Sequence, residues 1–87
     1  MATVYLPTQL REAAGGNTQF ELPGSTVREL VSALAAQHPG IEDRLIDDNE
    51  LARGLAVSID GSVAPLGLLA KVKLTSEVHF LPAIGGG

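Results

Sequence analysis

The chain has 87 residues, of which 45% are hydrophobic and 18% are charged, with one tyrosine, two phenylalanines and no tryptophan. This length and composition indicate one small globular domain with an aliphatic core, which excludes a second domain and a disordered chain. Six basic residues against ten acidic ones give a net charge of −4, which argues against nucleic acid as a partner. The acidic balance either suits a partner with a basic docking surface or serves solubility.

The N-terminal segment, residues 1–7, lacks the basic and apolar regions of a secretion signal, and no stretch is long enough to span a bilayer. We therefore expect a soluble, cytoplasmic protein that does not use a membrane.

Residues 3–6 and 19–22 alternate apolar and polar side chains as strands do, and Gly15-Gly16 between them suits a wide turn. These runs predict a hairpin whose inward-facing residues are Val4, Leu6, Phe20 and Leu22.

A helix is predicted to begin at Thr26. The Thr26 hydroxyl and the Glu29 carboxylate have the spacing of a capping box, in which each accepts a hydrogen bond from an unpaired backbone amide of the first turn. The apolar residues that follow recur at helical spacing and form one stripe that faces a sheet; they are Val27, Leu30, Val31 and Leu34. Pro39-Gly40 ends this helix.

The next segment is expected to be one or two further helical turns over residues 41–46, followed by a solvated polar loop over residues 47–50. Three carboxylates in this loop lack the glycine and ligand spacing of a calcium site, so no metal site is expected there. Asp60-Gly61 is a strong signal for a tight hairpin, and Pro82 is expected to end the last strand. The remaining predicted elements are a strand over 55–59, a short strand over 62–64, a brief helical or irregular cover over 66–70 and the last strand over 77–81.

The sequence ends in three glycines directly behind an apolar, strand-like run. Because glycine has no Cβ, an extended Gly86-Gly87 fits a channel too narrow for any other residue, and its carboxylate can approach a nucleotide closely. We interpret the α-carboxylate of Gly87 as a candidate reacting group. The alternative interpretation is a frayed end or a cloning remnant.

The chain contains no cysteine, which excludes disulfides, thiolate metal sites and cysteine-based catalysis. If the protein handles sulfur, the sulfur atom must be held by another group, and the Gly87 carboxylate is the best placed. No Ser/His/Asp set, paired-carboxylate pocket or Walker-type phosphate loop is present. His79 alternates with apolar Val78 and Phe80 and is interpreted as solvent-facing rather than as a ligand.

The predicted order of strand, strand, helix, short helix, strand, short strand and final strand is that of the α+β β-grasp (ubiquitin-like) fold, in which a mixed sheet wraps one main helix. This order, the Asp60-Gly61 hairpin and above all the ending at residues 80–87 resemble the ThiS/MoaD family of ubiquitin-like sulfur carriers. Chains of that family end in a diglycine after a hydrophobic-proline segment. Residues 38–45 and the Leu-Pro-Ala-Ile ending are most similar to the carriers that feed sulfur to cysteine synthesis.

Two features depart from the family pattern. Residues 74–77 replace the usual Gly-Asp turn before the final strand, and Gly85 is a third glycine that leaves Gly86-Gly87 as the functional pair. The resemblance implies a β-grasp domain over residues 1–84 and a flexible glycine tail over residues 85–87.

The resemblance also implies the chemistry. A ubiquitin-activating-like adenylating enzyme would use ATP to convert the Gly87 carboxylate into an acyl-adenylate, and a persulfide sulfurtransferase or sulfide would then displace AMP and leave a thiocarboxylate. An acceptor synthase, with cysteine synthase as one candidate, would take the sulfur for cysteine, thiamin, molybdopterin or another sulfur metabolite. The protein would bind no cofactor itself and would be a co-substrate rather than an enzyme. The residues expected to contact partners are Leu81, Pro82, Ile84, Gly85 and Gly86.

Two other classes of function remain open at the level of the sequence. A ubiquitin-like modifier would use the same activated Gly87 to form an isopeptide bond with a lysine. A non-covalent adaptor, or a small subunit that inserts its tail into a catalytic partner as in molybdopterin synthase, would keep the same fold and the same diglycine.

Overall fold

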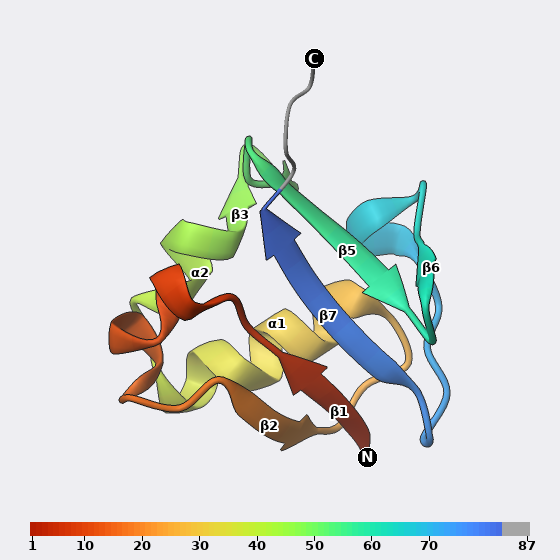
Figure 1. Cartoon of the computed structure of the whole chain (residues 1–87), viewed down its shortest axis with the longest axis horizontal. Helices are drawn as coiled ribbons and strands as arrows, with labels where there is room; N and C mark the ends of the chain where they lie inside the picture. The colour runs from red at the N-terminus through yellow and green to blue at the C-terminus, as the bar shows by residue number, and fades with distance from the viewer. Residues whose placement is uncertain (83–87) are drawn as a thin grey trace.

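The structure, a computed structural model, describes residues 1–82 and begins with the expected hairpin (Figure 1). Strand β1 (Ala2–Tyr5) pairs antiparallel with β2 (Gln19–Leu22), and Val4 lies opposite Phe20. The predicted inward face is confirmed, because Val4, Leu6 and Leu22 are buried and Phe20 is half-buried against the core.

The wide turn of this hairpin contains two short 3-10 helices, Thr8–Leu10 and Glu12–Ala14. Gly15 ends the second of them with φ at 70°, in the left-handed region that favours glycine. A Cβ at this position would lie 2.7 Å from Cε1 of His38, so glycine also allows the turn to pack closely against the residue that ends the main helix.

The main helix α1 (Val27–Gln37) is capped by Thr26, whose Oγ1 accepts a hydrogen bond from the Glu29 backbone N–H at 3.2 Å. The second half of the predicted capping box is shifted by one residue. The Glu29 carboxylate accepts hydrogen bonds from the Ser25 N–H at 2.7 Å and the Ser25 hydroxyl at 3.0 Å. The segment before the helix is extended and bridges Lys71, which fixes the Ser25 amide toward Glu29. These bonds, the backbone one foremost, lower the pKa of Glu29.

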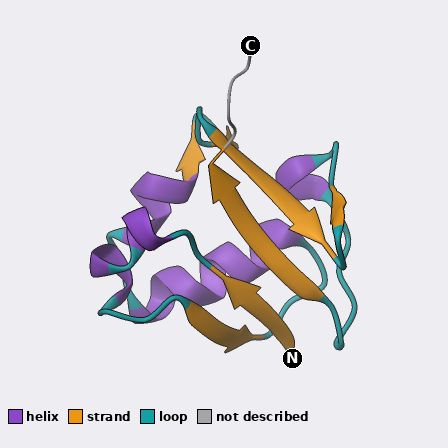
Figure 2. Ribbon diagram, viewed as in Figure 1, coloured by secondary structure: helices purple, strands orange, loops and turns teal. Residues whose placement is uncertain are grey.

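Helix α1 crosses one face of a five-stranded sheet (Figures 1 and 2). The sheet order is β2-β1-β7-β5-β6, and it contains β5 (Leu55–Ile59), β6 (Ser62–Val63) and β7 (Glu77–Pro82). β1 and β7 are parallel, whereas the other neighbouring pairs are antiparallel. This mixed sheet around one main helix confirms the predicted β-grasp fold. The predicted helix stripe is fully buried, as are the inward residues of the central strands, which include Val57, Val78 and Phe80.

The segment after α1 differs in part from the prediction. Helix α2 (Ile41–Leu45) is present, but residues 47–50 are not a loop, because β3 (Ile46–Asp47) and β4 (Glu50–Leu51) form a small antiparallel hairpin. Its turn residues Asp48 and Asn49 have φ values of 55° and 64°. Aspartate and asparagine tolerate this left-handed conformation, which is the one that a tight two-residue hairpin requires.

The Asp60-Gly61 hairpin between β5 and β6 is confirmed, with φ values of 50° and 89°. The predicted cover over residues 66–70 contains a 3-10 helix, Gly67–Leu69.

The turn before β7 is closed by Ser76, whose hydroxyl accepts a hydrogen bond from the Lys73 N–H at 2.9 Å. The Glu77 N–H donates to Asp60 Oδ1 at 2.9 Å. Side-chain oxygens therefore stabilise the turn that lacks the usual Gly-Asp pair.

Pro82 belongs to the last strand rather than lying beyond it, so the prediction that the strand ends before this proline is wrong by one residue. Pro82 lies opposite Leu55 at the end of the ladder. The Leu55 N–H donates to the Ala52 carbonyl at 3.0 Å instead of across the sheet. A residue without an N–H is tolerated at such an end position, because the strand stops there. The expected division of the chain after residue 84 lies outside the described residues.

Candidate functional site

The predicted partner-binding residues Leu81 and Pro82 lie side by side at the end of β7, at the edge of the molecule where the chain continues toward its glycines (Figure 1). Leu81 is 40% exposed, so its side chain is not part of the core. The other predicted site residues lie outside the described residues; they are Ile84, Gly85, Gly86 and Gly87.

The outer face of the sheet, opposite α1, carries an aromatic pair. On β7, Val78 and Phe80 point inward and are buried, whereas Glu77, His79 and Leu81 alternate with them and are at least partly exposed. The strand register places one row of outward residues across four strands: Tyr5, His79, Ser58 and Val63.

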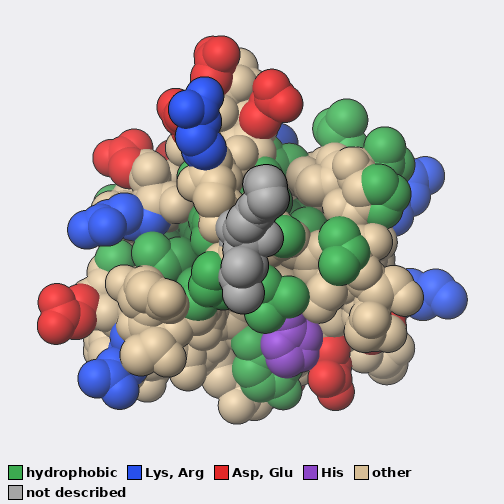
Figure 3. All heavy atoms as spheres, turned by 45° about the horizontal axis from the view of Figure 1, so that its top comes forward, with side chains coloured by type: hydrophobic (Ala, Val, Ile, Leu, Met, Phe, Trp, Pro, Cys, Tyr) green, Lys and Arg blue, Asp and Glu red, His purple; other side chains and the backbone are tan. Residues whose placement is uncertain are grey.

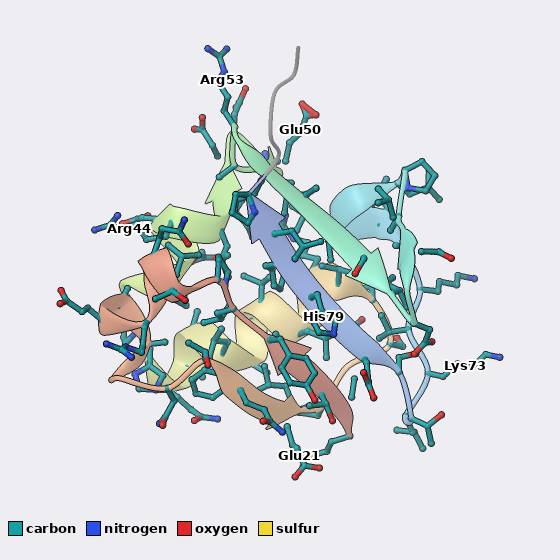
Figure 4. The ribbon with its side chains drawn as sticks, viewed as in Figure 1. Glu21, Arg44, Glu50, Arg53, Lys73 and His79 are labelled. Atoms are coloured by element: carbon teal, nitrogen blue, oxygen red, sulfur yellow. The ribbon has the colours of Figure 1, made fainter. Side chains whose placement is uncertain are left out.

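His79 lies on this outer face, as Figure 4 shows and as its spacing predicts. Its ring stacks on the ring of Tyr5, with centroids 4.3 Å apart and planes 10° apart. Glu77 Oε1 lies 3.8 Å from His79 Nε2. The Tyr5 ring therefore covers one face of the imidazole, and within residues 1–82 His79 belongs to no group of three or more side chains that could hold a metal ion.

An apolar surface extends from this row toward the end of β7. It consists of Leu81, Ala56 opposite it on β5, Val63 on β6, and Leu66 and Leu69 beyond β6. Val63, Leu66 and Leu69 are 67%, 65% and 72% exposed. Figure 3 shows hydrophobic side chains gathered on this end of the molecule. Several exposed leucines close together are typical of a surface that binds a partner rather than of one that only contacts solvent.

A shallow hollow of about 410 Å³ lies within this apolar surface. Its lining includes Leu51 of the small hairpin, Leu55 and Ala56 of β5, and Leu66 and Leu69. Asn49 and Glu50 add polar groups to one part of the lining, so the hollow can receive an apolar side chain of a partner beside a polar one.

Sequence reasoning missed Leu66 and Leu69, because the whole run over residues 66–70 was interpreted as cover for the core. Only Leu68 and Ala70 of that run are buried. The run contains a 3-10 helix, which has three residues per turn, so Leu66 and Leu69 share the exposed side while Leu68 points inward. The sequence did contain an indication of this exposure, because residues 66–70 include three leucines and so short a run cannot bury all of them.

Within residues 1–82, no group of three or more histidine, aspartate or glutamate side chains is positioned to hold a metal ion. In the same range, no buried side-chain nitrogen or oxygen lacks a hydrogen-bond partner. No helix of the described chain is both long enough and apolar enough to cross a membrane.

The fold and this surface define a ubiquitin-like protein of the β-grasp class. The chain matches the ThiS family over residues 4–87, and it belongs to this family. It is 31% identical over 90 residues to the sulfur carrier protein CysO of Mycobacterium tuberculosis, covering 98% of this chain and 97% of that protein. The chain is thus a member of a family of sulfur carriers, which are small substrate-like proteins rather than enzymes.

Solved structures agree with this assignment. The crystal structure of the Amycolatopsis orientalis BexX/CysO complex contains a similar chain, with a TM-score of 0.90, 35% identity and complete coverage of both chains. SAMP1 from Haloferax volcanii, a small archaeal modifier protein, has a TM-score of 0.72 and 30% identity, and covers 99% of this chain and 98% of its own.

Proposed function

We propose that the protein carries sulfur as a thiocarboxylate on Gly87. The observation that carries this proposal is the match to the ThiS family, which runs through to Gly87 in a chain that has no cysteine. Without a thiol, the chain has no persulfide site, and the α-carboxylate is the group on which a transferable sulfur can be placed.

The chemistry begins at a carboxylate, which is a poor acyl donor because its leaving group would be oxide. A partner enzyme transfers AMP from ATP to the Gly87 carboxylate and releases pyrophosphate. Sulfide then attacks the acyl carbon and AMP leaves. When the donor is a persulfide, a thiol must afterwards reduce the acyl disulfide to release the thiocarboxylate. The requirement for ATP leads us to place this chemistry in the cytoplasm.

The apolar surface supports docking to such an enzyme. Five residues follow Pro82, and an extended chain of this length reaches at most about 17 Å. An enzyme that holds the Gly87 carboxylate in its active site must therefore lie close to the end of β7. Leu81 lies at that end, and the exposed Leu66 and Leu69 line the hollow beside Leu55 and Ala56, the β5 partners of Pro82 and Leu81. Burial of these leucines against the enzyme would stabilise the complex.

For the acceptor, we propose a synthase of the cysteine-forming type. This assignment follows from residues 38–45 and from the Leu-Pro-Ala-Ile ending, which are most similar to the carriers of that pathway. The relatives named CysO support it at 31% and 35% identity. A relative of this similarity was crystallised in complex with a second protein, BexX, which supports stable partner binding by this fold.

A second candidate function is conjugation through Gly87 to lysines of other proteins. The similarity to the archaeal modifier SAMP1 favours it, because that protein shares the fold over nearly the whole chain. Immunoblots of host extracts distinguish the two functions, since a modifier produces a ladder of lysine-dependent adducts and a sulfur carrier does not.

The test of the proposed function compares the protein with a variant that has one alanine added after Gly87. Both are incubated with the host's ubiquitin-activating-like adenylating enzyme, ATP and sulfide. The unmodified protein should release pyrophosphate and gain about 16 Da, because sulfur replaces oxygen. The added residue moves the carboxylate away from the reacting position, so the variant should do neither. Equal sulfur transfer by both proteins, with unchanged melting curves, would contradict the proposal.

A further inference from the structure

A second hollow lies beside the end of β7, next to the first apolar one. Its volume is about 230 Å³, and its lining includes Leu10, Arg44 of α2, Arg53 and Gly54 of the loop before β5, and Pro82. The apolar part of the lining comes from Pro7, Leu10, Leu55 and Pro82, and Leu55 lines both hollows.

Two cationic side chains stand at this hollow. Arg44 and Arg53 are both exposed, and neither forms an ion pair within residues 1–82. Figure 4 shows Arg53 projecting beyond the end of β7 from the loop before β5, and Arg44 projecting to the side from α2. They supply two of the six basic residues of the chain, and five exposed carboxylates lie in the same segment: Glu42, Asp43, Asp47, Asp48 and Glu50.

The position of Pro82 relates these arginines to the tail. Pro82 lines the hollow and is also the residue from which the chain continues toward Gly87. Any channel that receives the tail therefore has its mouth beside the hollow. If the tail is extended in that channel, the nucleotide that reacts with Gly87 is about 17 Å further along the chain, which is too far for an arginine side chain to reach its phosphates.

We propose that Arg44 and Arg53 bind carboxylate side chains at the mouth of the channel through which the adenylating enzyme takes the tail, an inference that rests on the proposed function. A guanidinium group pairs with a carboxylate through two parallel hydrogen bonds, which fixes geometry as well as charge. The apolar floor of the hollow accommodates the methylene groups of a glutamate.

The charges around the end of β7 make this contact directional. Glu50 of β4 is exposed and projects near the same end of the molecule as Arg53 (Figure 4). An enzyme whose acidic residues face the two arginines, and not Glu50, is accepted in one orientation about the tail. Such patterns contribute to orientation and to the rate of association more than to the chemical step.

The test measures kcat and KM for ATP-dependent pyrophosphate release with the host adenylating enzyme, at low and at physiological ionic strength. The variant carries Arg44→Gln and Arg53→Gln. The matched control carries Lys71→Gln and Lys73→Gln, which removes the same charge elsewhere; Figure 4 shows Lys73 far from the two arginines. The arginine variant should lose about threefold to tenfold in kcat/KM at low salt, through KM with kcat unchanged, and less at higher salt. The control should stay within about twofold.

Each other outcome overturns the proposal. Unchanged kcat/KM in the arginine variant, with normal release by the unmodified protein, shows that the arginines do not contact the enzyme and leaves the proposed function intact. An increase in kcat/KM of the arginine variant shows instead that the arginines hold an anion of this chain, such as the Gly87 carboxylate, away from the enzyme. No release by the unmodified protein overturns the proposed function and this inference together.

Discussion

Truncation of Leu69 should weaken docking to the adenylating enzyme, whereas truncation of Leu74 should not. Both side chains are 72% exposed, so they are matched in size and exposure. They differ in position, because Leu69 belongs to the apolar surface beside the end of β7 and Leu74 lies in the turn before its start. A strand of this length spans roughly 20 Å, which separates Leu74 from the tail.

The magnitude follows from the exposed fraction. Leu69→Ala removes three carbon groups, each contributing about 0.8 kcal/mol on full burial, and about 72% of that area remains to be buried by a partner. The upper bound is therefore about 1.7 kcal/mol, or roughly a fifteenfold increase in KM.

Pyrophosphate release with increasing carrier concentration measures this KM. Both variants should unfold within about 0.5 kcal/mol of the unmodified protein, because both side chains are on the surface. Equal KM values for Leu69→Ala and Leu74→Ala would refute the docking surface, and a rise for Leu74→Ala alone would place the surface at the other end of β7.

Three further predictions concern the core, the helix start and the tail. Leu30→Ala should lower the free energy of unfolding by about 2–5 kcal/mol in denaturant titrations, since Leu30 is fully buried; a loss below about 0.5 kcal/mol would contradict its place in the core. Hydrogen bonds from Ser25 lower the pKa of Glu29 from 4.5, so its contribution to stability is present above the unfolded pKa and is lost as pH falls through the folded one. Glu29→Gln should therefore weaken the acid dependence of the urea midpoint, and an identical pH profile would be inconsistent with this pairing. Gly86→Val should abolish pyrophosphate release, because a branched Cβ does not fit a glycine-width channel; a normal rate would exclude such a channel.

The sequence was sufficient where structure follows from local periodicity. The stripe of Val27, Leu30, Val31 and Leu34 repeats at helical spacing, and the Asp60-Gly61 pair fits a turn that requires positive φ. The small hairpin at residues 46–51 was missed because two-residue strands are too short to show an alternation. The shift of the Glu29 bond to Ser25 depends on a bridge to Lys71, which is distant in the sequence.

The site was predictable only in part, because much of it also depends on contacts between residues that are distant in the sequence. Leu81 and Pro82 are adjacent in the sequence, so their position before the glycines could be inferred directly. The exposure of Leu69 depends on how the segment after β6 packs beside β5, which periodicity does not determine. Arg44 and Arg53 line one hollow because the chain before β5 returns to the end of α2, where the Ala52 N–H donates to the Leu45 carbonyl, and nothing in their spacing indicates this.

The most direct test of the central claim is the intact mass of the protein purified from its native host, followed by fragmentation that maps any added mass along the chain. A sulfur carrier of this kind should show a population heavier by about 16 Da, with the whole increase in the C-terminal fragment that contains Gly87. Treatment with an alkylating reagent should label that population alone, because the chain has no cysteine thiol to compete. Sulfur mapped to an internal peptide would contradict the account, as would alkylation without the increase of about 16 Da.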